Sequence, residues 1–155
     1  MLKKGIHVVL GVVVLGLLAG CGGAPKPAAP AAKAEYKAQL KLATLTPAAH
    51  TYNLGANKLA EAVKERSKGR IEIKIYPDGQ LGKGEREVLE GLQQGNVDIY
   101  VGSTGPIGNF SPSMLIVDIP FLFRDFNHVD KVLDGPIGQK LLADLEKSNL
   151  KGLAF

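Results

Sequence analysis

The chain is poor in the residues from which nucleophilic and metal-dependent active sites are built. Its 155 residues include one cysteine and three histidines. One of these, His7, falls in an N-terminal apolar run, so only His50 and His128 remain for chemistry. No G-x-S-x-G motif is present, and neither a catalytic triad nor a histidine-rich metal site can be assembled from the spacing. The residues present therefore provide no catalytic set, and we expect no metal and no cofactor.

Long runs of one charge are also missing. The chain has 19 basic and 15 acidic residues, a formal net charge of +4. Without Lys3 and Lys4, which belong to the N-terminal segment, 17 basic residues face 15 acidic ones and the net charge is +2. The two signs are mixed along the predicted helices. This balance excludes the basic stripe by which proteins hold nucleic acid.

The longest apolar run lies at the N-terminus, where Lys3 and Lys4 precede residues 6–18. The run is short and interrupted by glycine, which is typical of a secretory signal rather than a membrane span. It ends in "LAGC", which resembles the lipobox of bacterial lipoproteins. We expect residues 1–20 to be a signal peptide and Cys21 to carry lipid on the extracytoplasmic side of a bacterial membrane. The alternative for Cys21, which has no disulfide partner, is a free buried thiol.

Residues 21–37 contain three prolines among alanines and almost no side chain that could join a core. Because proline favours extended backbone, we interpret this segment as a semi-stiff tether. The folded part then occupies residues 38–155.

Strand and helix patterns alternate along the first half of the folded part. Strands are predicted at residues 39–45, 70–76 and 97–103, and helices at 50–69 and 85–95. The second strand sets Ile71, Ile73 and Ile75 on one face. The first helix has an apolar stripe of Tyr52, Ala56, Leu59, Ala60 and Val63. Short connections between alternating elements predict an α/β fold with a parallel sheet.

The second half is predicted to contain a packed loop from Thr104 to Pro120 and a short helix within residues 121–135, which begins after a cap at Asp125 or Asn127 and stops at Gly135. A further helix at 136–149 has Pro136 in its first turn. The closing residues "LKGLAF" are interpreted as the start of another strand.

A glycine-rich loop separates the second strand from the second helix. Gly79, Gly82 and Gly84 run as G-x-x-G-x-G, and Glu85 and Glu87 follow in the first helical turn. Carboxylates at a helix N-terminus satisfy its positive dipole end and repel phosphate. The spacing therefore predicts a turn, not a nucleotide site.

A few polar residues follow the predicted strands. Ser103 and Thr104 follow the third predicted strand. Their hydroxyls either face a ligand at the carboxyl edge of the parallel sheet or stabilise the turn to which they belong. His50, between the first strand and helix, is either a ligand contact or an exposed residue at the helix start. Arg124 either binds an anion or pairs with a nearby acid such as Asp125.

The stretch "GRIEIKIYPDGQLGKGEREVLEGLQQGNVDIYVGST" resembles the solute-binding proteins of tripartite ATP-independent periplasmic (TRAP) transporters, the DctP family. Further matches are His50 ahead of the first helix, "DIPFLFRDFNHVDKVLDGPIGQKLL" and the final "KGL". Together they cover residues 40–155.

The resemblance implies a periplasmic-binding-protein-like lobe with a mainly parallel sheet flanked by helices. It also implies capture of a small organic acid and delivery to membrane permease subunits. Family members are about twice this length, so we expect an N-terminal part without the second lobe and without the arginine that grips the substrate carboxylate. The implied ligand-facing positions are Leu45, Thr46, His50, Glu85, Tyr100, Gly102, Ser103 and Thr104. Leu45 and Gly102 replace acidic or amide side chains of some relatives, which leaves them shape or backbone contacts.

Three alternatives stay open from the sequence. The first is the receptor of an ATP-driven importer, which shares the signal, tether and α/β lobes. The second is an exported α/β enzyme whose active site lies in a missing C-terminal region, and the third is a structural lipoprotein.

Overall fold

A computed structural model describes residues 36–155. The predicted signal peptide at residues 1–20, Cys21 and nearly all of the predicted tether at 21–37 lie outside the described residues. Within residues 36–155, no helix has the length and apolar character that crossing a membrane requires.

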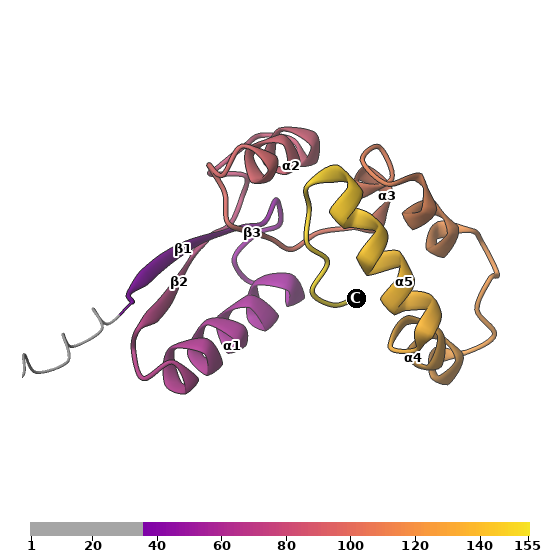
Figure 1. The fold of residues 1–155 in the computed structure, drawn as a ribbon, viewed down its shortest axis with the longest axis horizontal. Coiled ribbons are helices and arrows are strands. Elements are labelled where there is room, and N and C mark those ends of the chain that lie inside the picture. The colour runs from indigo at the N-terminus through magenta and orange to yellow at the C-terminus, as the bar shows by residue number, and fades with distance from the viewer. Residues whose placement is uncertain (1–35) are drawn as a thin grey trace, which may run out of the picture. The chain divides into compact units, whose positions relative to one another are not determined.

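The described part is built on a three-stranded parallel sheet (Figure 1). Its strands are β1 (Ala38–Ala43), β2 (Ile71–Tyr76) and β3 (Ile99–Tyr100), in the order β2-β1-β3. β1 pairs with β2 over its full length, in a register that sets Leu42 opposite Ile75. On its other side Leu42 and Ala43 pair with Ile99 and Tyr100. The predicted parallel α/β fold is therefore confirmed.

β3 is much shorter than the predicted strand at 97–103. The side chain of Asp98 accounts for its start, because its Oδ2 accepts a 2.7 Å hydrogen bond from the backbone N–H of Lys41. A carboxylate there takes the place of a backbone carbonyl in the ladder. The backbone N–H of Asp98 still donates to Lys41 O at 3.1 Å. Regular pairing is thus confined to the two residues after Asp98.

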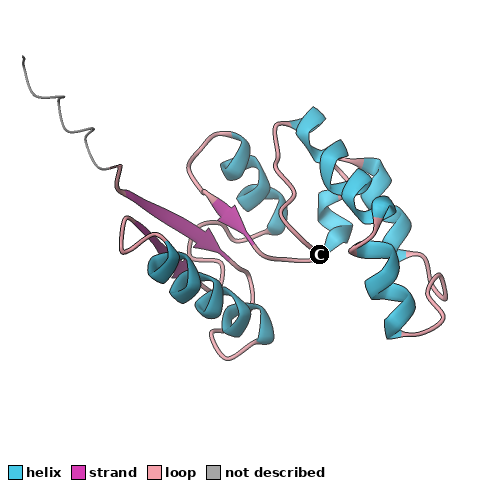
Figure 2. Ribbon diagram, turned by 60° about the horizontal axis from the view of Figure 1, so that its bottom comes forward, coloured by secondary structure: helices cyan, strands magenta, loops and turns pink. Residues whose placement is uncertain are grey.

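Two helices cover opposite faces of the sheet, as Figures 1 and 2 show. They are α1 (Thr51–Arg66) and α2 (Glu85–Gln93), close to the predicted bounds. The predicted apolar stripe of α1 is only partly buried, because Tyr52 is 36% and Leu59 39% exposed. Ala56 of that stripe is buried as predicted, and the other buried residue is Asn53, which the stripe does not include. The inward face of α1 is therefore rotated from the one that apolar spacing predicts.

The C-terminal half departs further from the predictions. The predicted loop contains a short helix, α3 (Thr104–Ile107), and a 3-10 helix, η1 (Pro112–Asp118). The next helix, α4 (Phe126–Leu133), begins after Asp125, whose Oδ1 accepts from His128 N at 2.8 Å. Asp125, rather than Asn127, is thus the cap. Phe121, ahead of this cap, has a left-handed φ of 62° and lies outside the helix.

The last predicted helix is confirmed as α5 (Pro136–Asp144), which continues into the 3-10 helix η2 (Leu145–Ser148). The predicted strand at residues 150–155 is wrong, because this segment pairs with no strand of the described part. It lies instead against α5, where a Cβ on Gly152 would come within 3 Å of Leu142. A strand is stable only with a paired neighbour, and apolar alternation alone does not supply one.

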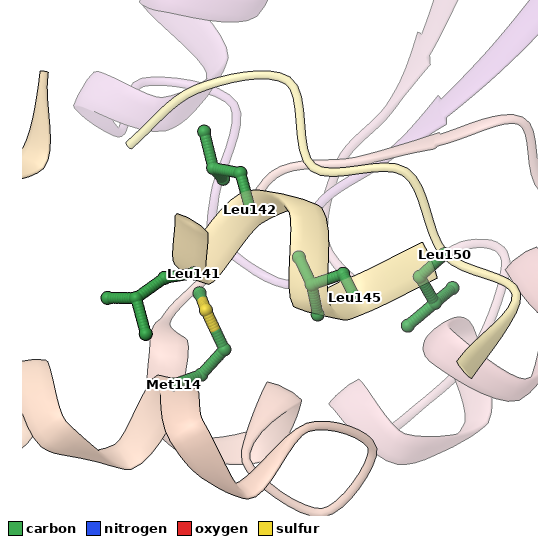
Figure 3. Packing of buried hydrophobic residues seen from close by; sticks show 5 residues of the cluster. All are labelled: Met114, Leu141, Leu142, Leu145 and Leu150. Atoms are coloured by element: carbon green, nitrogen blue, oxygen red, sulfur yellow. The ribbon is translucent and has the colours of Figure 1, made fainter. Parts of the chain in front are cut away.

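The buried apolar side chains form two clusters. One joins η1 to α5 and the residues after it (Figure 3), through Met114, Leu141, Leu142, Leu145 and Leu150. The other joins β1, α2 and the approach to β3, through Ala43, Val88 and Val97. The second cluster fixes α2 against the sheet and so determines where its first turn lies.

A buried polar contact holds the connection between β1 and α1. The Asn53 side chain is 1% exposed, and its Oδ1 accepts from Thr44 Oγ1 at 2.8 Å. Its Nδ2 lies 3.1 Å from Thr46 O, 3.2 Å from Thr46 Oγ1 and 2.9 Å from Pro47 O. One amide therefore satisfies a buried hydroxyl and the turn that follows β1.

We predict that Asn53→Ala lowers the free energy of unfolding by about 3 kcal/mol, because Thr44 and the turn carbonyls lose their buried partner. Urea denaturation of the protein measures this loss. Asn57→Ala is the matched control, since Asn57 is exposed on the same helix, and it is expected to change stability by less than about 0.5 kcal/mol. Equal losses in the two variants would contradict the assignment.

Candidate functional site

The candidate site lies at the edge of the sheet where all three parallel strands end. Such edges are where open α/β sheets bind their ligands. The loops after β1 and β2 are joined there by backbone hydrogen bonds, from Asp78 N to Thr46 O and from Gly79 N to Thr44 O, both 3.1 Å. The predicted site residues all lie in these loops, at the end of β3, or in the first turns of α2 and α3.

The loop after β1 carries Leu45, Thr46 and His50, and their contacts are internal. The hydroxyl and carbonyl of Thr46 both accept from Asn53. Leu45 lies close to Gly79, where a Cβ would meet Leu45 Cδ2 at 3.4 Å. His50 is the N-cap of α1, and its Nδ1 accepts from Tyr52 N at 3.2 Å. The structure thus supports a helix-capping role for His50, while ligand contact by these three residues stays a prediction.

The glycine loop is a turn, as its sequence predicts. Asp78 and Gly79 have left-handed φ values of 53° and 67°. Gly82 allows a close approach to α2, because a Cβ there would lie 2.8 Å from Val88 Cγ2. Glu87 accepts from Lys83 N at 2.8 Å, so its carboxylate already satisfies a backbone donor next to the helix start. A phosphate at this helix start would therefore meet a carboxylate and a backbone N–H that is already bonded.

Glu85 takes a different direction from Glu87 and joins two other predicted site residues. Its Oε1 accepts from Tyr100 Oη at 2.8 Å and from Ser103 Oγ at 3.2 Å. Glu85 and Tyr100 are half-buried and Ser103 is exposed. We call these three residues the Glu85 cluster. They come from α2 and from the end of β3, separated by up to 18 residues in the chain.

Gly102 makes room for this cluster. A Cβ at Gly102 would lie 1.8 Å from Tyr100 Oη, so any side chain there would displace the phenol. The pKa of Tyr100 is raised well above its ordinary value, first by burial and then by the hydrogen bond and negative charge of Glu85. The phenol therefore remains protonated and donates to Glu85 throughout the neutral range.

Thr104 begins α3 and contacts an acid that sequence reasoning missed. Its Oγ1 donates to Asp118 Oδ1 at 2.5 Å. Asp118 ends η1, inside the segment predicted to be a loop, and it opens the family-like stretch that begins "DIPFLF", where no role was predicted for it. The strand edge therefore carries a second carboxylate next to the Glu85 cluster.

Arg124 does not pair with Asp125, contrary to one of the two sequence expectations. Among residues 36–155 it takes part in none of the ion pairs, and the Asp125 carboxylate caps α4 instead. The described residues also contain no group of three His, Cys, Asp or Glu side chains arranged to hold a metal ion.

A cavity of about 680 Å³ borders the candidate site. Tyr100, Gly102 and Thr104 lie along it, but most of its walls are apolar side chains from α1, η1, α5 and the final residues, including Tyr52, Leu59, Met114, Leu142 and Phe155. A carboxylate placed there would lose its hydration against mostly apolar walls, and Lys151, the lysine that lines the cavity, is already paired with Glu146. The cavity therefore does not fit an anion, and the polar cluster beside it is the better candidate.

A parallel sheet with polar residues gathered at its carboxyl edge is an arrangement in which open α/β folds bind ligands. The sequence profile of DctP, the bacterial extracellular solute-binding protein family 7, matches residues 42–155. The chain belongs to this family, as its motifs predicted.

Three similar proteins illustrate the family. The C4-dicarboxylate-binding protein DctB of Bacillus subtilis (strain 168) is 43% identical over 102 residues, covering 66% of this chain and 29% of that protein. The 2,3-diketo-L-gulonate-binding periplasmic protein YiaO of Escherichia coli (strain K12) is 37% identical over 103 residues, which cover 66% of this chain and 31% of that protein.

The third is a crystal structure of a TRAP periplasmic solute-binding protein from Polaromonas sp. JS666 bound to D-erythronate. It matches with a TM-score of 0.72 and 43% identity, covering 76% of this chain and 39% of that one. The chain thus spans about a third of the length of the curated relatives it matches.

We predict that the Tyr100 phenol ionises well above pH 10, and that Glu85→Gln lowers its pKa by removing the nearby negative charge. The protonated phenol favours the folded state, so its contribution to stability is complete below pH 10 and is lost as the pH rises toward the folded-state pKa. Difference absorbance near 295 nm between the protein and Tyr100→Phe isolates this group. A Tyr100 signal that ionises at its ordinary pH would contradict the hydrogen bond to Glu85.

Proposed function

We propose that this chain is the N-terminal part of the extracytoplasmic receptor of a TRAP transporter. The receptor captures a small organic acid and delivers it to the membrane permease subunits, and it performs no catalysis. Family membership over residues 42–155 supports this function. The observation that carries it at the level of the site is the Glu85 cluster, which gathers three predicted ligand-facing residues at the carboxyl edge of the sheet.

The described part supplies one side of such a site. The Glu85 cluster and the Thr104–Asp118 pair contribute carboxylates and hydroxyls, and no lysine or arginine bonds to any of these side chains among residues 36–155. A ligand carboxylate is held best by a bidentate arginine. We propose that this cation comes from sequence beyond residue 155, which has counterparts in the longer relatives.

We predict that the full-length protein binds at least one organic acid with a Kd of about 10 µM or tighter, whereas the 155-residue polypeptide binds it more weakly than about 1 mM. The missing cation is the physical reason for the difference. Isothermal titration calorimetry against four- to six-carbon acids, with neutral sugars as controls, measures both values.

Two outcomes would contradict the proposal. One is a full-length protein that binds none of the acids. The other is a gene neighbourhood that encodes an ATPase instead of a pair of integral membrane permease subunits, which would assign the receptor to an ATP-driven importer.

We further propose that Cys21 carries the lipid that holds the receptor at the membrane, after removal of residues 1–20. The apolar run followed by "LAGC" supports this anchor. Each buried methylene of an acyl chain contributes roughly 0.8 kcal/mol to membrane binding.

We predict that Cys21→Ala abolishes incorporation of an alkyne-tagged fatty acid during expression in a bacterial host, because the acceptor thiol is lost. Fluorescence of the clicked tag on a gel reports the modification, and the unchanged protein is the positive control. Labelling that persists in Cys21→Ala would place the lipid elsewhere or exclude it.

A further inference from the structure

We propose that the residues following Phe155 in the full-length protein add a β-strand to the open edge of β3 and fill the cavity beside it. The inference rests on one part of the proposed function, namely that the chain is the N-terminal part of a longer receptor. It goes beyond that function because it names the surface that the remainder of the receptor covers. A helix face, a sheet edge and the course of the last residues each support it.

The face of α1 that carries its apolar stripe is incompletely covered. Tyr52, Ala56 and Leu59 lie on this face and line the cavity. Tyr52 is 36% and Leu59 39% exposed, although their spacing is that of a helix side that packs against a core. A helix in a protein is stabilised mainly when such a stripe meets another apolar surface. Within residues 36–155 that second surface is incomplete.

β3 is an edge strand of the sheet, and the cavity lies along it. One side of β3 faces β1, where Val101 N donates to Ala43 O at 3.1 Å. Because neighbouring residues of a strand direct their backbone groups to opposite sides, the N–H and C=O of Tyr100 point away from β1. In the described residues no strand lies on that side. Open strand edges of this kind pair readily with a further strand.

The last residues of the chain lead into the cavity. Leu150 N donates to Leu145 O at 3.2 Å. A Cβ on Gly152 would come within 3 Å of Leu142, so the segment runs back along α5. The C-terminus lies between α1 and α5 (Figure 1), and Phe155 lines the cavity. The chain spans about a third of the length of its curated relatives, so the sequence that follows starts at the cavity.

A strand fits the cavity better than a small molecule or a second copy of the chain. The volume of about 680 Å³ is far above the water-sized voids that packed interiors tolerate. A small apolar molecule would cover Tyr52 and Leu59 but would leave the backbone groups of Tyr100 without partners. A strand bonds to those groups and packs its apolar side chains against α1 at the same time. A second copy would have to enter a cavity that Phe155 already lines.

Thiol labelling of the full-length protein tests whether this face of α1 is covered. Leu59→Cys is combined with Cys21→Ser, and Cys21→Ser alone gives the background reactivity. We expect the new thiol to react with 5,5′-dithiobis(2-nitrobenzoate) at least about 100-fold more slowly than Glu61→Cys, because only rare opening of the fold exposes it. Glu61 is the matched control, since it is exposed two residues further along the same helix.

Equal rates at the two positions would overturn the inference. Protection of Leu59→Cys that disappears on dilution would assign the face to a second copy and would also overturn it. A full-length protein that binds an organic acid but reacts equally at both thiols refutes this inference alone, whereas one that binds no acid refutes the proposed function.

Hydrogen exchange of the unsubstituted full-length protein tests the added strand and decides the matter if Leu59→Cys does not fold. The amide of Val101 is the internal reference, because its N–H is bonded to β1. We expect the Tyr100 amide to exchange within about 10-fold of the Val101 rate, since a strand on the open edge would accept its hydrogen. Residue-resolved NMR measures both rates. A Tyr100 amide that exchanges more than about 10-fold faster than that of Val101 would overturn the inference.

Discussion

The central position of β1 is the constraint on which the rest of the structure depends. β1 pairs in parallel with β2 on one side and β3 on the other, so all three strands end at one edge. This pairing brings the turn after β1, the glycine loop after β2 and the residues after β3 together from positions far apart in the chain. Asn53 then fixes the turn after β1 by bonding Thr44, Thr46 and Pro47.

At that edge, two acidic side chains of the first helical turn of α2 perform different tasks. Glu87 bonds a backbone N–H beside the helix start, while Glu85 reaches the end of β3 and accepts from Tyr100 and Ser103. The absence of a side chain at Gly102 leaves the space that the Tyr100 phenol occupies. Burial and Glu85 together hold the pKa of that phenol above its ordinary value, which keeps it a donor. The hydroxyl donors at this edge are thus bonded to carboxylates of the chain itself.

Sequence patterns predict the elements that are determined by residues close together in the chain. Alternation of isoleucines identifies β2, and the turn residues with the following acids identify the glycine loop and the start of α2. It could not predict that Asn53 is buried while Tyr52 and Leu59 are exposed, because the inward face of α1 is decided by hydrogen bonds to the neighbouring turn. Likewise, β3 is shortened by a side-chain contact of Asp98 with a strand 57 residues away.

The candidate site was likewise predictable only in part from the sequence. The resemblance to the DctP family supplies Glu85, Tyr100 and Ser103 as separate positions, and only the fold shows that they bond to one another. Asp118 opens a stretch that resembles the family, but its contact with Thr104 could not be predicted, because Thr104 lies 14 residues earlier and across a helix that apolar spacing does not predict. Alternation predicts a strand at 150–155, yet pairing is decided by neighbours that alternation does not encode.

The most direct test of the account is a crystal structure of the protein with an organic acid bound. We expect the ligand at the carboxyl edge of the sheet, in contact with the Glu85 cluster. A ligand that lies away from Glu85, Tyr100 and Ser103 would contradict it.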